Sequence, residues 1–347
     1  MRTNERLPGR TPNMPLITIG VPTYNREDFA LATVERLLRF EESDIEILVS
    51  DNASDDNATK RLQQLRDHRL QIFRQPHNIG GIANFDFLLS RAKGEFFILH
   101  QDDDCVDSGF LPALLRALAM APDIQLFTTP YWRGNPHKGY RSEMSALLGR
   151  ICGLPDHANE IAVVPGREIA PLFLTGLPFL NPGLAYRTAT LRGAGGFGGS
   201  DCLWGGDILL SARMLLTGSI AFLPTPRSTF HEHESNQSYM VARKDRDRGF
   251  GLLYQMLVER FDQEGIHWRE TVMAELSSMR LSEVLELVCR WTRQRAPEEL
   301  TGIGWRCYLK RDGRVFRRYW RACAKLGVPS FVRLVCCSMR EQGKAHG

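Results

Sequence analysis

The stretch LITIGVPTYNR, residues 16–26, places a short apolar run directly before a polar turn. The run has the length of one buried strand, and the polar residues begin where that strand should end. The same order recurs in DIEILVS at 44–50, followed by DNASD, and in GEFFILH at 94–100, followed by QDDD. LQIFR at 70–74 and IQLFTT at 124–129 are further apolar runs of similar length. We therefore predict five strands.

Segments compatible with helices separate these runs. They are expected to begin near Asp28, with Phe29, Val34, Leu37 and Leu38 at helical spacing, and to span 56–67, 81–92 and 108–120. Strands that alternate with helices indicate an α/β fold with a mostly parallel, doubly wound sheet. Ligands of such sheets bind beyond the carboxyl ends of the strands. We expect the three polar clusters to meet at one edge of the sheet.

The chain of 347 residues is long enough for one large domain and an appendage. We expect a flexible N-terminus at 1–13, an α/β domain at 14–240 with halves at 14–130 and 131–240, and a helical C-terminal region at 241–347. Long loops are expected at 131–170, and helical segments at 251–261 and 271–292. The first residues contain no apolar core of a secretory signal, and no apolar run reaches the length of a membrane span.

The charge is unevenly distributed. Residues 305–347 hold eleven Lys and Arg against two acidic residues, although the whole chain carries only +4. The overall balance argues against a nucleic-acid binder. The basic tail mixes Arg and Lys with apolar residues, which suits either a helix lying on an anionic membrane surface or a solvated appendage or subunit interface. Eight cysteines without a C-x-x-C pair indicate reduced thiols in the cytosol.

The triplet Asp102-Asp103-Asp104 is a candidate metal site. Carboxylate oxygens are preferred ligands of Mg²⁺ and Mn²⁺, and such an ion can neutralise a diphosphate leaving group. A solvated acidic turn is the alternative. Tyr24 and Asp51 lie at two other strand ends. The Tyr24 ring could stack on a base, and the Asp51 carboxylate could accept a hydrogen bond from a base or a ribose hydroxyl. Asp51 is alternatively an ordinary turn residue.

Three later segments also carry candidate chemistry. Asp207 opens a helical segment and is either a capping carboxylate or a base. His231 and His233 would share one face of an extended segment, where either could complete a metal shell or be a surface side chain. The segment 193–198 matches G-x-G-x-x-G by letter, but no strong helix pattern follows it, and we interpret it as a glycine-rich turn.

Taken together, these motifs resemble the GT-A glycosyltransferases of family 2, over roughly residues 14–240. The resemblance is carried, in order, by IGVPTYNR (19–26), VSDNASD (49–55), NIGGIANF (78–85), AKGE (92–95), DDD (102–104), Tyr186-Arg187, GGF (195–197), Gly206-Asp207 and His233-x-x-Asn236-x-Ser238.

The resemblance implies an inverting, metal-dependent sugar transferase of the bacterial polysaccharide type. Asp207 would be the general base, and Mn²⁺ or Mg²⁺ would be held by Asp102, Asp104 and His233. The donor nucleotide would be bound by Pro22, Thr23, Tyr24, Asn25, Arg26, Asp51, Asn78, Asn84, Asp102 and Asp103. Residues 14–130 would form the nucleotide-sugar half and residues 131–240 the acceptor half. The chain departs from the family at Gly206, where the family usually has Glu, at His100-Gln101 before the triplet, and over 131–175.

The expected donor is a nucleoside-diphosphate sugar, with UDP or dTDP favoured. The expected acceptor is a glycan or lipid-linked saccharide, reached at the cytosolic face of a membrane by a cytoplasmic, peripheral enzyme that binds no nucleic acid. A catalytically inactive nucleotide- or glycan-binding protein is one alternative, motivated by Gly206. A metal-dependent phosphoryl-transfer enzyme built on the same acidic cluster is another.

Overall fold

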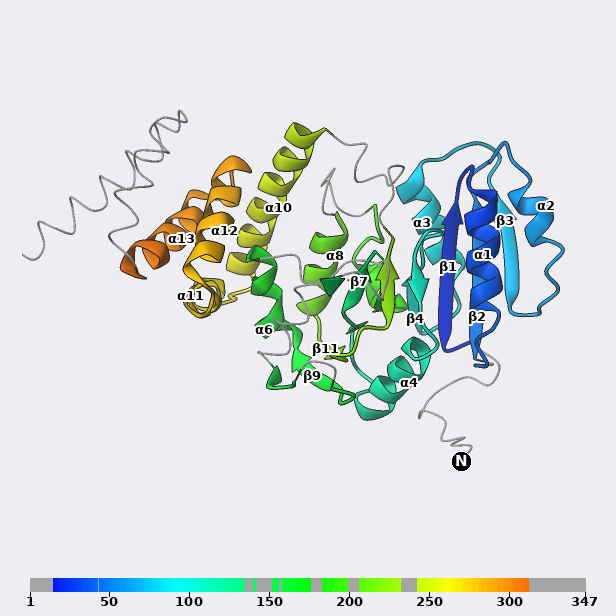
Figure 1. Cartoon of the computed structure of the whole chain (residues 1–347), viewed down its shortest axis with the longest axis horizontal. Helices are drawn as coiled ribbons and strands as arrows, with labels where there is room; N and C mark the ends of the chain where they lie inside the picture. The colour runs from blue at the N-terminus through cyan, green and yellow to red at the C-terminus, as the bar shows by residue number, and fades with distance from the viewer. Residues whose placement is uncertain are drawn as a thin grey trace, which may run out of the picture. The chain divides into compact units, whose positions relative to one another are not determined.

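The computed structural model describes residues 15–42, 44–134, 140–141, 152–155, 158–175, 183–198, 206–231 and 242–311. Contacts divide the chain into two compact units, Met1–Val241 and Ala242–Gly347. Each unit is described by itself below, with the element labels of Figure 1.

An eight-stranded sheet forms the centre of the first unit, in the order β3-β2-β1-β4-β10-β6-β11-β9. Its strands are β1 Ile17–Thr23, β2 Ile45–Asp51, β3 Leu70–Arg74, β4 Phe96–Leu99, β6 Leu126–Thr128, β9 Ala162–Pro165, β10 Leu184–Arg187 and β11 Ser219–Phe222. Neighbours pair in parallel except where β10 joins β4 to β6 and where β9 joins β11. The predicted α/β class with a mostly parallel sheet is confirmed.

The helices of this unit follow the strands in the alternation predicted from the sequence. They are α1 Glu27–Leu37, α2 Ala58–Leu62, α3 Gly81–Arg91, α4 Phe110–Met120, α6 Gly166–Ile169, α7 Thr188–Gly193 and α8 Gly206–Leu215, with a 3₁₀ helix at Ala170–Leu174. All five predicted strands form, each within about two residues of its expected ends. The helix expected at 56–67 is shorter, because residues after Leu62 form turns that lead into β3.

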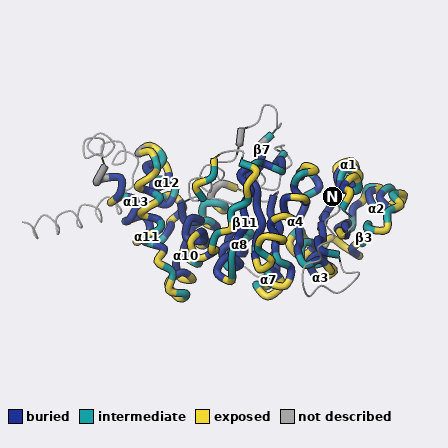
Figure 2. Tube along the Cα trace, turned by 90° about the horizontal axis from the view of Figure 1, so that it is seen from below, coloured by how far each residue is buried: buried dark blue, intermediate teal, exposed yellow. Residues whose placement is uncertain are grey.

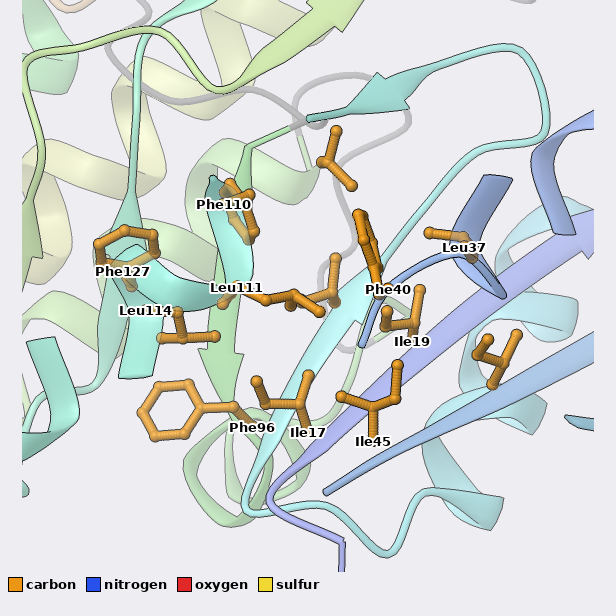
Figure 3. Packing of buried hydrophobic residues seen from close by; sticks show 14 of the residues in the cluster. Ile17, Ile19, Leu37, Phe40, Ile45, Phe96, Phe110, Leu111, Leu114 and Phe127 are labelled. Carbon is orange, nitrogen blue, oxygen red and sulfur yellow. The ribbon is translucent and has the colours of Figure 1, made fainter. Parts of the chain in front are cut away.

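The core lies between the sheet and the helices that cover it (Figure 3). One face of the strands, with Ile17, Ile19 and Ile45, packs against Leu37 of α1 and Leu111 of α4. The opposite face meets α3, and there a Cβ on Gly20 would overlap Phe97 and contact Leu88. Helices on both faces explain why the central strands are buried along their whole length (Figure 2), and why they read as continuous apolar runs.

The region predicted as long loops, 131–170, contains regular structure in its described part. A second sheet has the order β5-β12-β7-β8, with β5 Cys105–Val106, β7 Tyr131–Arg133, β8 Tyr140–Arg141 and β12 Ser228–Phe230. The strands β9, β7 and β8 are two to four residues long. The prediction of loops was wrong there because such short strands form through pairing with distant segments and leave little local periodicity.

The second unit is helical in its described part. Its helices are α10 Arg243–Gln263, α11 Trp268–Ser278, α12 Leu281–Arg293 and α13 Glu298–Arg311. The helical segment predicted over 271–292 is divided at Met279-Arg280. There the Glu283 carboxylate accepts from the backbone N–H of Arg280 at 2.9 Å, so that Glu283 caps the start of α12. In the described residues of either unit, no helix is both long and apolar enough to span a bilayer.

Candidate functional site

The polar clusters meet at one edge of the sheet, as the sequence predicts. β1 lies between β2 and β4 and is parallel to both. The register pairs Thr23 with Asp51 at the ends of β1 and β2, and Gly20 with Leu99 near the end of β4. The residues that follow these strands, 24–26, 52–55 and 101–104, therefore share the edge where open α/β sheets bind ligands.

The acidic triplet is held by the end of β1, by the turn that follows it and by α1. The Thr23 hydroxyl donates to Asp102 Oδ2 at 2.9 Å. Arg26 Nη1 lies 3.1 Å from Asp102 Oδ1 and 2.6 Å from Asp103 Oδ2, so one guanidinium bridges two carboxylates. The Thr33 hydroxyl of α1 donates to the Asp102 carbonyl at 2.8 Å. The triplet is therefore a fixed structure and not a solvated acidic turn.

Asp104 is the most buried of the three aspartates, at 2% exposure. The backbone N–H of His231, directly after β12, points at Asp104 Oδ1 over 3.4 Å. His231 Nδ1 lies 2.8 Å from the Asp103 carbonyl. Of the two candidate histidines, the structure thus places His231 at the triplet. His233 lies outside the described residues.

The carboxyl groups of Asp102 and Asp104 are hard to ionise in this surrounding. Burial raises the pKa of Asp102 to about 6, with a contribution from Asp103, although Arg26 and Thr23 oppose the shift. Burial raises the pKa of Asp104 well above its ordinary value, and the negative charges of Asp103 and Asp102 add to this. Additional positive charge beside these groups would lower both pKa values.

The carboxylate oxygens of the triplet are the kind of ligand that a hard divalent cation prefers, but they are too few to hold one alone. Among the residues that the structure describes, no three or more His, Cys, Asp or Glu side chains are arranged to hold a metal ion. Mg²⁺ is commonly bound in proteins by one or two carboxylates, with substrate phosphates and waters completing the shell. Asp102 and Asp104 fit that partial shell, and they would not form a site closed by protein ligands alone.

Asp51 is fully buried and holds together the loop that follows β2. Its Oδ1 accepts from the backbone N–H of Ser54 at 2.8 Å, and its Oδ2 accepts from the Thr59 hydroxyl and from Arg74, the latter at 2.6 Å. Burial opposes ionisation, but the hydrogen bonds from Ser54 and Thr59, together with Arg74, leave the pKa of Asp51 lowered overall. In this conformation the carboxylate orders the loop and has no exposed surface.

Asn78 and Asn84, which were expected to bind the donor, also form hydrogen bonds that hold backbone segments in place. Asn78 accepts from Asn52 Nδ2 and from the backbone N–H of Gly80, both at 2.9 Å. Asn84 is buried on α3; its Oδ1 accepts from the Ser50 hydroxyl at 2.6 Å, and its Nδ2 donates to the Ser50 carbonyl at 3.1 Å. These contacts fix the loops around the edge.

The turn after β1 presents the accessible part of the site. Pro22 is buried in β1, whereas Tyr24 is 43% exposed, so its ring is available for stacking. Asn25 has a positive φ of 53°, a conformation that asparagine tolerates better than most residues. The backbone N–H of Asn25 donates to the Ser54 hydroxyl at 2.8 Å, which ties this turn to the loop after β2.

Asp207 lies in the first turn of α8, as the sequence predicts. Its Oδ1 accepts from the backbone N–H of Ile208 at 3.0 Å. Burial raises the pKa of the Asp207 carboxyl, and the N–H groups of Ile208 and of Asp207 itself oppose the shift. A carboxylate whose pKa is raised is a better proton acceptor near neutral pH.

Several residues that build this edge were not identified from the sequence. Thr33 and Ser54 support the two loops, and Arg74 pairs with Asp51 across β3 and β2. Thr33 had a readable signal, because it is a polar residue on the same face of α1 as Ala30, Val34 and Leu37, and a buried hydroxyl needs a partner. The sequence places Ser54 in the DNASD cluster but gives no signal for its hydrogen bond to Asn25, and it gives no signal for Arg74, because both contacts depend on strand order.

Comparison with known proteins assigns the class. Residues 18–185, just under half of the chain, match the family model described as Glycosyl transferase family 2. The resemblance inferred from the motifs is thereby confirmed. Among curated relatives, the GalNAc(5)-diNAcBac-PP-undecaprenol beta-1,3-glucosyltransferase of Campylobacter jejuni is 33% identical over 106 residues, which cover 30% of this chain and 34% of that protein. The chain thus spans about a third of that relative's length.

Solved structures show the same fold at low sequence identity. S. aureus TarS 1-349 in complex with UDP-GlcNAc gives a TM-score of 0.59 at 16% identity, covering 85% of this chain and 88% of that one. The mannosyltransferase PcManGT from Pyrobaculum calidifontis, in complex with GDP-Man and Mn²⁺, gives 0.50 at 14% identity and covers 86% and 87%. These similarities confirm the GT-A fold.

Proposed function

We propose that this chain is an inverting, metal-dependent glycosyltransferase. It moves a sugar from a nucleoside-diphosphate donor, with UDP or dTDP favoured, to a lipid-linked saccharide in the synthesis of a surface polysaccharide. The observation that carries the proposal is the junction of the Thr23–Arg26 turn with a buried acidic triplet at the ligand-binding edge of the sheet. A relative whose name includes an undecaprenol-linked glycan, and a structural neighbour in complex with UDP-GlcNAc, support the substrate class.

The roles of the residues follow from their surroundings. Tyr24 stacks on the base at the exposed rim of the site. Mg²⁺ or Mn²⁺ held by Asp102 and Asp104 would supply charge neutralisation for the diphosphate leaving group. Asp51, Asn78 and Asn84 keep the surrounding loops in place, and Asp51 would contact the nucleotide only after its loop rearranges. His233 is proposed as a further ligand on the resemblance alone.

Asp207 acts as the general base. Its carboxylate takes the proton of the acceptor hydroxyl while the hydroxyl oxygen bonds to the anomeric carbon. The bond from that carbon to the diphosphate oxygen breaks, and the nucleoside diphosphate leaves with the electron pair. One displacement from the opposite side inverts the anomeric centre. Burial raises the pKa of the Asp207 carboxyl, which makes its carboxylate a stronger proton acceptor for this step.

We further propose that the enzyme works in the cytoplasm as a peripheral protein at the cytosolic face of a membrane. The support is the basic sequence of residues 305–347 and the lipid-linked substrate in the name of a relative. Residues 312–347 of this tail lie outside the described part of the chain.

Calorimetry with UDP, dTDP, GDP and CDP, each with and without Mn²⁺, is the first test. We expect one nucleotide to bind tightly and only with the metal. Asp104→Asn should weaken that binding at least about tenfold, because it removes a charged ligand. Asp123→Asn, a change at an exposed turn residue before β6, is the matched control and should bind like the unmodified protein. Unchanged affinity in Asp104→Asn would remove Asp104 from the metal site.

Transfer assays then test the base. Asp207→Asn should lower kcat by about 10²- to 10⁴-fold and leave nucleotide affinity within about twofold. Loss of binding and turnover together would argue against Asp207 as the base. Gly206, in place of the usual Glu, favours one rival, an inactive protein that binds nucleotide or glycan. Nucleotide binding without any sugar transfer or donor hydrolysis would support that rival.

A further inference from the structure

The glycine-rich turn between α7 and α8 is fastened to α3 by one carboxylate. Asp86, in the middle of α3, accepts from the backbone N–H of Phe197 at 2.7 Å and from that of Gly198 at 2.9 Å. Each oxygen of the carboxylate takes one of these bonds. The partners are more than a hundred residues apart in the sequence, so the contact joins two distant segments of the first unit.

The glycines of this turn are explained by the approach of Asp86. Gly196 has a positive φ of 67°, and a Cβ there would overlap Asp86 Oδ1. A Cβ on Gly198 would lie 2.8 Å from Asp86 Oδ2. Gly193, at the end of α7, would place its Cβ in open space. Segment 193–198 is therefore a glycine-rich turn, as the sequence predicts. Two of its glycines leave room for the Asp86 carboxylate.

An aromatic contact adds to the same fastening. Phe197 is buried between three rings: Phe85 of α3 at 5.9 Å, Tyr186 of β10 at 5.9 Å and Phe97 of β4 at 6.2 Å between ring centroids. Phe85 and Asp86 are neighbours on α3. One segment of α3 thus fixes the turn in two ways. The Phe85 ring packs against Phe197, and the Asp86 carboxylate accepts two hydrogen bonds from the turn.

α3 carries two residues that support different parts of the proposed site, Asn84 and Asp86. Asn84 fixes the end of β2 through Ser50, at the edge where the donor binds. Asp86 fixes the turn that follows α7, and α7 packs both against α3 and against α8, whose first turn holds Asp207. We infer that Asp86 is a positioning residue for the general base, which sets the place of Asp207 relative to the donor. This inference rests on the proposed function.

Kinetics of sugar transfer test this role. Asp86→Ala should lower kcat about 10- to 100-fold, since small misplacements of reacting groups have effects of that size. The Kd of the nucleotide with Mn²⁺ should stay within about twofold, because Asn84 still fixes the donor edge. Asp86→Asn keeps one acceptor oxygen and should recover part of the rate. Gly193→Ala is the matched control and should behave like the unmodified protein.

A double-mutant cycle separates positioning from general stability. Gly198→Ala should lower kcat on its own, because the methyl group pushes against Asp86. In the Asp86→Ala background the same change should have a smaller effect, so the two changes should not add. Full additivity would overturn the proposal. So would a joint fall of kcat, nucleotide affinity and unfolding midpoint in Asp86→Asn, or a kcat in Asp86→Ala equal to that of Gly193→Ala.

Hydrogen exchange distinguishes failure of this inference from failure of the proposed function. The amides of Phe197 and Gly198 should exchange faster in Asp86→Ala than in the unmodified protein. Unchanged exchange at both amides would overturn the fastening itself. Faster exchange in a protein that transfers no sugar from any donor would leave the fastening in place, and would overturn both the proposed function and the positioning role.

Discussion

Arg69 shows how one residue organises a connection that the sequence does not predict. Its side chain is only 10% exposed. It donates to the carbonyls of Phe40 at 2.7 Å and of Leu38 at 2.8 Å, just after α1, and it pairs with Asp67 at 2.9 Å. These two carbonyls lie outside any helix or strand. The Arg69 guanidinium therefore donates the hydrogen bonds that regular secondary structure would otherwise supply.

Asp67→Asn should reduce stability in a pH-dependent way. The hydrogen bond from Arg69 lowers the pKa of Asp67 from 3.8 to about 2, although burial opposes it. A lowered pKa in the folded state stabilises the fold above the unfolded value, and this stabilisation is lost as pH falls from about 4 to about 2. We expect a loss of about 1 kcal/mol at pH 7, after allowance for solvent screening. Urea unfolding between pH 2 and pH 7 measures it.

The control for this prediction is Asp123→Asn, at an exposed position in a turn. It should unfold at the same urea concentration as the unmodified protein throughout the pH range. If the difference between Asp67→Asn and the unmodified protein were constant between pH 2 and pH 7, the ion pair with Arg69 would not be its cause.

At the scale of elements, two glycines of α13 should respond oppositely to alanine. A Cβ on Gly304 would overlap Val288 of α12 and lie 2.8 Å from Trp291 Cζ3, whereas a Cβ on Gly302 would meet open space. Gly304→Ala should destabilise the second unit by about 1–3 kcal/mol through overpacking. Gly302→Ala should stabilise it by about 0.5–1 kcal/mol, because alanine favours a helix interior. Thermal unfolding followed by circular dichroism compares the two.

Each of these variants serves as the control for the other, since both add one methyl group to the same helix. A destabilised Gly302→Ala, or a neutral Gly304→Ala, would mean that α12 and α13 do not pack as described.

Elements with local signals were predicted from the sequence, and those made by distant pairing were not. β1, β2, β4 and β6 are short apolar runs buried along their whole length, so composition alone indicates them. β10 carries four residues and lies antiparallel between β4 and β6, a position that only strand pairing determines. The break at Arg280 was missed because the usual capping residues, Ser, Thr, Asp or Asn, are absent from that position.

The candidate site also has features that the sequence predicts and features that depend on contacts between distant segments. The strand-end motifs predicted that Thr23, Arg26 and Asp102 lie at one edge, because parallel strands end together. The structure adds that Asp51 is enclosed by Ser54, Thr59 and Arg74, which depends on packing between β2, β3 and the loop between them. Sequence spacing gives the edge on which a residue lies, but it does not give the partners that occupy its oxygens.

At the scale of the whole molecule, the two units have separate cores. The first unit is built around its sheet, and the second buries Trp268, Trp291, Phe261 and Tyr308 among helices. The proposed donor site uses described residues of the first unit only. The two units are therefore expected to respond differently to a ligand.

Nucleotide with Mn²⁺ should protect the first unit selectively against hydrogen exchange. A ligand at 100 times its Kd stabilises the unit that binds it by about 2.7 kcal/mol. Amides of β1, β2 and β4 that exchange through unfolding of that unit should slow about 100-fold, while those of α11, α12 and α13 should keep their rates. Asp104→Asn with the same nucleotide is the control and should show little protection in either unit. Equal protection in both units would mean that they unfold as one cooperative body, whereas protection of the second unit alone would place the nucleotide outside the edge formed by β1, β2 and β4.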